Sequence, residues 1–314
     1  MADLGLREAP TTVPQLDDSV SSQWQVPEIT VSLALFGKFQ QLIYAETGIW
    51  LSESKTALLC GRLARRLRAL RLRSLRDYYN IVIQPDQQEE RVLMVDAITT
   101  NETHFFREPQ HFEFLANQVF PVWREAAVQG RRSRTIRIWS AGCSSGEEAY
   151  SLAMVLARHF PASDGWDPRV VGTDISTHVL ATAREGIYRI AGARHIPKEF
   201  LDDFMLKGYA EREGKMKVAR EIRRMVEFKR LNLSDQSYEI QGMFDAIFCR
   251  NVLIYFDATS KRKVVEKLVR HLRPEGLLFI GHAENLHSLT QGLRCVAATV
   301  YVQASTQKVV REEN

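Results

Sequence analysis

Two glycines and two glutamates lie close together in the segment Gly142-Cys-Ser-Ser-Gly-Glu-Glu148. Gly142 and Gly146 carry no Cβ, so a ligand could approach the backbone closely at this turn. A pyrophosphate would rest on the free N–H groups of a helix that begins here. Glu147 and Glu148 occupy those positions, and they would repel a phosphate but attract an ammonium or sulfonium group. The pattern favours a zwitterionic or cationic ligand, such as S-adenosylmethionine, over a dinucleotide.

A purely structural role for this turn stays open. Carboxylates in the first turn of a helix stabilise the helix dipole without any ligand. The spacing Gly142-x-Ser144-x-Gly146 differs from the G-x-G-x-x-G of dinucleotide-binding proteins, and no lysine follows to complete a P-loop. The choice between a ligand turn and a structural turn therefore depends on which other residues meet this segment.

Three further polar residues lie at or near the ends of apolar runs that are typical of buried strands: Asp174, Asn232 and Asn251. An acid at the tip of the second strand of a β-α-β unit can hydrogen-bond a ribose diol. A helix N-cap is the alternative role for Asp174. Because ligands of open parallel sheets bind outside the carboxyl ends of the strands, these residues and the glycine turn are predicted to form one pocket.

The elements that carry these residues alternate between strand and helix. A strand from Ile136 leads into the glycine turn, and apolar residues at helical spacing predict a helix from Glu147. After a strand at Leu277–Ile280, the runs Cys295–Ala297 and Val300–Gln303 predict an antiparallel hairpin. This alternation predicts an α/β fold with a doubly wound, Rossmann-like sheet.

The pattern loosens between Gly186 and Met225. The segment Lys215–Val226 fits either β-hairpin material or a basic helix. We interpret the region 186–230 as containing a small inserted β-subdomain that precedes the strand at Val226.

Composition narrows the class of protein. The chain has 314 residues, 25% of them charged and 45% hydrophobic, and its net charge is 42 − 38 = +4. Its four cysteines are scattered without a C-x-x-C pair, which fits a reducing cytoplasm and predicts no zinc site. We see no signal peptide, and no apolar run reaches the roughly 18 residues of a membrane span. The composition predicts a cytoplasmic protein of about two domains, with no metal and no membrane insertion.

The N-terminal third is predicted to be separate from the sheet. Residues 1–27 read as a flexible arm, 28–98 as a helical domain, and 99–135 as a linker segment with a connecting helix. The sheet domain then spans 136–305, and 306–314 form a C-terminal tail.

The helix predicted after Ser52 has an unusual charge pattern. The segment Lys55–Arg76 holds eight basic residues and no acidic one, and its leucine stripe leaves Arg62, Arg66 and Arg73 as the most exposed arginines. Like charges four residues apart cost a few tenths of a kcal/mol per pair. The face is therefore either simply solvated or a docking surface for an acidic partner. Aromatic residues for base stacking are absent from the segment, which disfavours nucleic acid.

Together these segments resemble a known family. Across about residues 28–305 the chain resembles the chemotaxis receptor methyltransferases, the CheR family. The matching segments, in order, are Ile98–Arg107, Trp139–Ser151, Gly172–Ile175, Phe248–Asp257 and Gly281–Asn285. The resemblance implies methyl transfer from S-adenosylmethionine to glutamate side chains of chemoreceptors, giving glutamyl methyl esters and S-adenosylhomocysteine for chemosensory adaptation. It also implies docking on the receptors' cytoplasmic helical bundle through the basic helix 55–76 and the β-subdomain.

The resemblance further implies which residues form the site. Those that bind the cofactor are Asn101, Thr103, Arg107, Gly142, Glu147, Asp174, Asn232, Leu233, Arg250 and Asn251. Glu147 would hold its methionine part, Asp174 its ribose, and Asn232 with Leu233 its adenine. Asn101, Thr103 and Arg107 would reach the cofactor from the interdomain segment, while Arg250, Asn251 and Tyr255 would line the methyl-transfer end. Arg107 and Tyr255 are the predicted catalytic residues.

The chain departs from the wider pattern at two places. Ser140 and Ser144 stand where S-adenosylmethionine enzymes generally carry an acid and a glycine. The turn Lys207–Gly214 has fewer glycines than the turn of family members that grip a receptor C-terminal peptide.

Chemistry gives Arg107 and Tyr255 specific tasks. A glutamate carboxylate is already ionised at neutral pH, so alignment rather than a general base is required. Arg107 is suited to clamp that carboxylate through a bidentate pair, and Tyr255 to present its hydroxyl, unless it is only a core aromatic.

Two rival classes of function remain. A nucleic-acid methyltransferase would carry Asn-Pro-Pro-Tyr where this chain has Asn251-Val-Leu-Ile-Tyr255, and a silent cofactor-sensing protein would lack the substrate-side residues.

Overall fold

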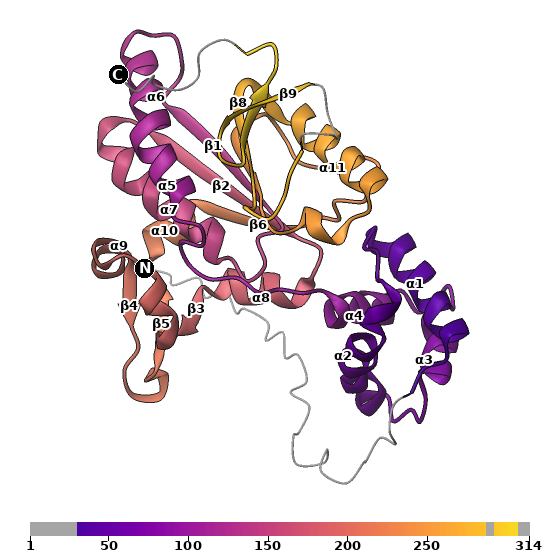
Figure 1. Cartoon of the computed structure of the whole chain (residues 1–314). Coiled ribbons are helices and arrows are strands. Elements are labelled where there is room, and N and C mark those ends of the chain that lie inside the picture. Colours follow the sequence, from indigo (N-terminus) through magenta and orange to yellow (C-terminus); the bar gives the residue numbers. More distant parts are fainter. Residues whose placement is uncertain (1–29, 287–291, 307–314) are drawn as a thin grey trace, which may run out of the picture.

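The structure is a computed structural model, and it describes residues 30–286 and 292–306. The predicted arm 1–27 and residues 307–314 of the predicted tail lie outside the described residues. A helical module lies beside a larger α/β module, from which a small β-sheet projects (Figure 1). Within the described ranges, every helix is too short or too polar to cross a membrane.

The predicted doubly wound sheet is confirmed. It has seven strands in the order β6-β2-β1-β7-β8-β10-β9, and the first five are parallel to one another. The two last strands form the predicted antiparallel hairpin, with β10 against β8. The strands are β1 (Thr135–Ala141), β2 (Asp167–Asp174), β6 (Val226–Arg230), β7 (Phe244–Cys249), β8 (Leu272–Ile280), β9 (Leu293–Ala297) and β10 (Val300–Gln303).

Helices cover both faces of this sheet because successive strand residues point to opposite sides. Ile138 of β1 belongs to the core beneath α7 (Glu147–His159), α5 (Gln110–Phe114) and α6 (Phe120–Val128). Its neighbour Trp139 belongs to the core beneath α11 (Ala258–Arg270). The helix α8 (Thr177–Glu185) follows β2. Ile138 and Trp139 are both fully buried, although they point to opposite faces of the sheet. A parallel sheet that is covered on both faces has near-continuous apolar strands for this reason.

Two local predictions about the strands need correction. The strand from Val226 ends at Arg230, before Asn232. The strand predicted at Leu277–Ile280 begins earlier, because β8 spans Leu272–Ile280 with an irregular stretch in which pairing with β7 jumps from Leu272 to Leu277.

The inserted β-subdomain is a three-stranded antiparallel sheet in the order β3-β5-β4. Its strands are β3 (Ile187–Arg189), β4 (Met205–Lys207) and β5 (Lys215–Val218), with α9 (Lys198–Phe204) between the first two. Both readings of the segment Lys215–Val226 were partly right, because β5 is followed by the short helix α10 (Arg220–Arg224). The next strand, β6, already belongs to the main sheet.

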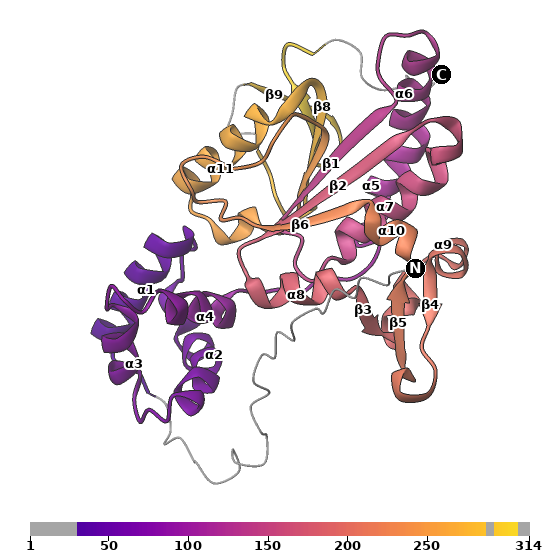
Figure 2. The same ribbon diagram turned by 180° about the vertical axis from the view of Figure 1, so that it is seen from behind.

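The helical module contains α1 (Leu33–Thr47), α2 (Thr56–Ala69), α3 (Leu75–Val82) and α4 (Gln88–Ile98). Leucines and aromatic residues of all four helices form its separate core. Two side-chain pairs fasten it to the α/β module: Tyr44 donates to Asp257 at 2.7 Å, and Thr177 donates to Asp96 at 2.7 Å. The module thereby lies near α8 and the start of α11 in both views (Figures 1 and 2).

The basic helix is less exposed than predicted. It begins at Thr56, after a turn of 3-10 helix, and ends at Ala69. Arg73 is exposed as predicted, but Arg62 and Arg66 are partly buried. Arg66 forms a bidentate pair with Glu90 of α4, at 2.9 and 2.5 Å, so the charge is compensated from another helix. The exposed basic residues of this segment are Arg65, Arg68, Arg71, Arg73 and Arg76.

Candidate active site

The polar residues predicted at the strand tips line one cavity between the two modules. The empty space in it is about 1080 Å³, a volume that includes open solvent. The helical module supplies one wall, including α1, α2 and the segment after α4, while loops at the carboxyl ends of β1, β2, β6 and β7 supply the other.

The glycine turn after β1 has the shape that the sequence suggested. Gly142 has φ +81°, and a Cβ there would meet a Val252 methyl at 2.4 Å, so the position requires glycine. Ser144 adopts φ +50°, a left-handed conformation that a serine tolerates poorly. Its hydroxyl donates to the Asn101 carbonyl at 2.9 Å. The serine therefore ties the interdomain segment to the glycine turn.

Asp174 is buried at the tip of β2 and lines the cavity. Its two carboxylate oxygens accept the backbone N–H groups of Ser144 and Ser176, each at 2.9 Å. Burial raises the pKa of Asp174, and these backbone bonds oppose that shift. The alternative role considered for Asp174 was that of a helix N-cap. Ser176, two residues later, is the N-cap of α8 instead.

Arg250, at the end of β7, is enclosed by two carboxylates. Its guanidinium lies 2.9 Å from Glu108 Oε2 and 3.2 Å from Glu148 Oε2, and it donates to the Arg107 carbonyl at 2.5 Å. Ser140 donates to the other oxygen of Glu148 at 2.7 Å. Burial raises the pKa of Glu148, while Arg250 lowers it. Arg250 is thus compensated by two carboxylates, of which only Glu148 lines the cavity.

The loop after β7 carries Asn251 and Tyr255, and the carboxylate of Glu284 fixes it from beneath. Glu284 is 5% exposed and accepts the N–H groups of Asn251 at 2.9 Å, Ile254 at 3.1 Å and Gly281 at 2.6 Å. These bonds hold Asn251 at φ +58°. Tyr255 is half-buried and lines the cavity, so it is not a core aromatic.

Three positive groups line the same cavity. Arg62 donates to the Ile98 carbonyl and, at 2.8 Å, to the Thr100 hydroxyl. Lys55 lies over the Tyr255 ring, 5.9 Å from its centroid. Arg107 is half-buried rather than buried, and its guanidinium donates to the Glu102 carbonyl at 3.0 Å. All three cations line the cavity.

Asn232 joins the two modules and lines the cavity. Its amide nitrogen donates to the Glu46 carbonyl at the end of α1, at 2.7 Å, and its oxygen accepts the N–H of Ser234 at 2.9 Å. Leu233 next to it is buried and also lines the cavity.

The structure thus brings together ten of the eleven predicted site residues. They are Asn101, Thr103, Arg107, Gly142, Asp174, Asn232, Leu233, Arg250, Asn251 and Tyr255. Glu147 is not among the lining residues; its carboxylate accepts the Ser145 hydroxyl at 2.7 Å. Its neighbour Glu148 lines the cavity instead.

The list of predicted site residues omitted four that shape the site: Glu108, Glu148, Glu284 and Arg62, although Glu148 had been named with Glu147 as a possible partner of a cationic group. The glutamates had a weak signal, since each lies inside or beside a motif that was singled out for another residue. Arg62 had been assigned to the exposed face of its helix.

Comparison with known proteins decides the family. The model of the "CheR methyltransferase, SAM binding domain" matches residues 101–302, and that of the "CheR methyltransferase, all-alpha domain" matches 34–99. The chain belongs to the CheR methyltransferases. A "Chemotaxis protein methyltransferase 2" of Pseudomonas aeruginosa is 42% identical to this CheR methyltransferase over 272 residues, covering 86% of this chain and 92% of the relative. The "Chemotaxis protein methyltransferase" of Escherichia coli is 39% identical over 274 residues, covering 87% and 92%.

The cofactor of this CheR methyltransferase is S-adenosylmethionine, and the cavity fits that molecule on chemical grounds. The buried carboxylate of Asp174 at a strand tip suits a ribose diol. The carboxylate of Glu148 in the cavity wall suits the ammonium or sulfonium group of the cofactor. Gly142 also lines the cavity, but Val252 takes the space of its missing Cβ.

Proposed function

We propose that this CheR methyltransferase transfers the methyl group of S-adenosylmethionine to glutamate side chains of chemoreceptors, forming glutamyl methyl esters. The observation that carries the proposal is the presence of both signs of charge in the cavity. The carboxylates of Glu148 and Asp174 line it, where a cationic cofactor fits, and the cations Lys55, Arg62 and Arg107 line it too, where they could attract an anionic substrate. The names of the relatives, chemotaxis protein methyltransferases, support the same substrate class.

The cofactor supplies a methyl group on a sulfonium, which is a good leaving group. We propose that Asn101 and Thr103 bind it from the interdomain segment, that Asp174 binds its ribose, and that Asn232 and Leu233 frame its adenine. For its methionine part, the placement of Glu148 in the cavity wall favours Glu148 over Glu147, or the two acting together. Arg250 and Asn251 complete the wall at the methyl-transfer end.

The substrate carboxylate needs orientation rather than activation, because glutamate has a reference pKa of about 4.3. Arg107 is the proposed carboxylate clamp, since its guanidinium has spare donors and is tethered to Glu102 by one nitrogen only. Tyr255 presents its ring and hydroxyl beside Lys55. Alignment of this kind can lower a barrier by several kcal/mol, with an upper range of about 7–11.

The receptor surface is proposed to include the exposed arginines of α2 and the turn after it, together with the β-subdomain. Five basic side chains are exposed there, and they lie on the same module as Lys55 and Arg62 of the cavity. On the β-subdomain, Leu206 and Tyr209 are 57% and 76% exposed. The cytoplasmic helical bundle of a chemoreceptor, if acidic, could touch both surfaces. Docking on that bundle would place the enzyme in the cytoplasm.

The rival functions predict different products. A nucleic-acid methyltransferase would label DNA or RNA, and a silent cofactor-sensing protein would bind S-adenosylmethionine without turnover. The half-buried Arg107 and Tyr255 in the cavity wall argue for a working substrate side.

Labelled S-adenosylmethionine distinguishes these possibilities. The enzyme is incubated with chemoreceptor-containing membranes, and the receptor is then treated with mild base. The proposal predicts label in the receptor that base releases as methanol, because carboxyl esters are base-labile. Base-stable label, label in nucleic acid, or no label despite measurable cofactor binding would contradict it.

A further inference from the structure

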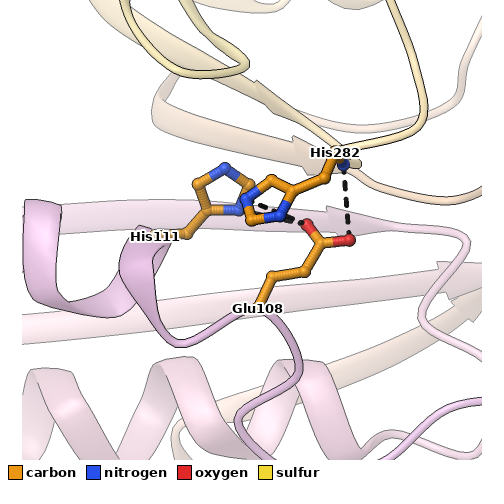
Figure 3. Close-up of side chains that lie close together, drawn as sticks. All are labelled: Glu108, His111 and His282. Atoms are coloured by element: carbon orange, nitrogen blue, oxygen red, sulfur yellow. Dashed lines mark hydrogen bonds and ion pairs between the residues drawn. The ribbon is translucent and has the colours of Figure 1, made fainter.

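A cluster outside the proposed reaction joins Glu108 to two histidines from distant parts of the chain. Glu108 precedes α5, His111 lies on α5, and His282 follows β8 (Figure 3). Glu108 Oε2 lies 3.6 Å from His111 Nδ1 and 3.9 Å from His282 Nε2. One donor atom from each residue lies within 4.8 Å of the others. None of these residues lines the cofactor cavity.

Hydrogen bonds define the tautomer of His111. Its Nε2 lies 2.9 Å from the Thr299 hydroxyl, whose own proton is donated to the Ala298 carbonyl at 2.8 Å. The hydroxyl must therefore accept from His111, so Nε2 carries the hydrogen. His111 Nδ1 is then left with a lone pair and no hydrogen.

That lone pair is the anomaly of the cluster. His111 is 2% exposed, and its Nδ1 has no hydrogen-bond partner among the residues that the structure describes. It faces a carboxylate oxygen at 3.6 Å, so two electron-rich atoms face each other in a buried place. Buried polar atoms are normally paired, and an exception calls for a missing group such as an ion.

We propose that Glu108, His111 and His282 form a binding site for a divalent transition-metal ion of the zinc class, with water as the fourth ligand. Two imidazoles and one carboxylate are a recognised ligand set for zinc with an open position. Tetrahedral bonds of about 2.0–2.1 Å place ligand atoms roughly 3.4 Å apart. The separation of 3.6 Å already approaches this, and His282, with a side chain 43% exposed, can move to close the remaining gap.

The surroundings match what zinc ligands require. The Nε2–H of His111 is oriented by Thr299, and metal-bound histidines typically donate their second nitrogen in this way. Glu108 Oε1 is held by the N–H of His282 at 3.3 Å and the amide of Asn251 at 3.4 Å. Arg250 competes for Oε2 through Nη2 at 2.9 Å and Nε at 3.3 Å, so a metal ion must displace at least one of these contacts, which lowers the affinity.

Cobalt(II) is a direct probe of this site, because its visible absorption reports coordination geometry. Metal-free, full-length protein without a histidine tag is titrated with cobalt(II) and then with zinc(II). We expect the intense bands of four-coordinate cobalt, which zinc removes. Absence of such bands at saturating cobalt would overturn the proposal.

A variant assigns the site to these residues. His282→Ala changes a partly exposed side chain, so the fold should survive, and the affinity for cobalt should fall at least about tenfold. His178→Ala, at an exposed position of α8 away from the cluster, is the matched control and should bind as the wild type does. Equal affinity of the His282 variant and the wild type would refute the assignment.

Nitrogen chemical shifts of His111 supply an independent test. In metal-free protein they should show hydrogen on Nε2 only, and zinc should shift Nδ1. A hydrogen on Nδ1 at neutral pH would mean that a proton occupies the gap and would overturn the proposal.

Discussion

Replacing Glu284 by glutamine should loosen the loop that carries Asn251 and Tyr255. The carboxylate accepts three backbone N–H groups, with Oε2 shared by Asn251 and Gly281 and Oε1 bound to Ile254. Glutamine can place its oxygen at only one of these positions. Its NH2 group must then face a backbone N–H, which becomes a buried donor without an acceptor.

The size of the effect follows from these bonds. An unsatisfied buried N–H costs about 1–3 kcal/mol, and the two remaining bonds each weaken by about 1 kcal/mol when the acceptor loses its charge. Burial also penalises the charged carboxylate and raises the pKa of Glu284, so glutamine recovers part of this loss. The net expectation is about 2–4 kcal/mol of lost stability, or roughly 5–15 °C in the melting temperature of the α/β module.

Thermal unfolding and single-turnover methyl transfer measure the two consequences. Turnover should also fall at temperatures at which the variant is still folded, because Asn251 and Tyr255 no longer hold their positions. Glu275→Gln is the matched control, since Glu275 is exposed on β8, the strand that precedes Glu284, and should change stability by less than about 0.5 kcal/mol. If Glu284→Gln melts and turns over as Glu275→Gln does, the account of this loop is wrong.

Three further predictions concern the cofactor, the substrate and the receptor. Asp174→Ala should weaken S-adenosylmethionine binding by about 1.5–3 kcal/mol per lost charged hydrogen bond, measured by calorimetry. Because burial raises the pKa of Asp174, wild-type affinity should begin to fall on acidification at a higher pH than that of an exposed aspartate, and Asp174→Asn should lose this component. Arg107→Lys should fold normally but lose most single-turnover activity, because an ammonium lacks the planar fork; near wild-type turnover would make Arg107 structural. Replacing the exposed Arg65, Arg68 and Arg73 together by glutamate should slow methylation at sub-saturating receptor and flatten the salt dependence of the rate. Salt acts on this step because exposed charges are screened over about 8 Å. An unchanged rate and salt slope would mean that this face is only solvated.

The site was largely predictable because topology decides where strand tips meet. The sequence placed Asp174, Asn232 and Asn251 after strands, and parallel strands bring such residues to one edge of the sheet. The sequence could not predict that Glu148, rather than Glu147, lines the cavity. Adjacent residues of a helix point about 100° apart, so only one of the two can face the cavity. Only the docking of Arg250 selects which of the two faces the cavity.

The basic helix shows a different limit. Leucine spacing reveals which side of α2 faces its own core, and Leu59, Leu63 and Leu67 are indeed buried. It does not reveal that α4 supplies Glu90 to Arg66, or that the segment after α4 covers Arg62. Both contacts come from residues more than twenty positions away, so no local pattern contains them.

The central claim is tested most directly by the chemical identity of the methylated atom. A cytoplasmic receptor fragment is prepared with its methyl-accepting glutamates intact, and a second with glutamine at the same positions. Both are incubated with enzyme and S-adenosylmethionine and analysed by tandem mass spectrometry. The account predicts a single added methyl, as a base-labile ester on glutamate, in the first fragment only. Equal methylation of the glutamine fragment, or a base-stable methyl group on either, would contradict it.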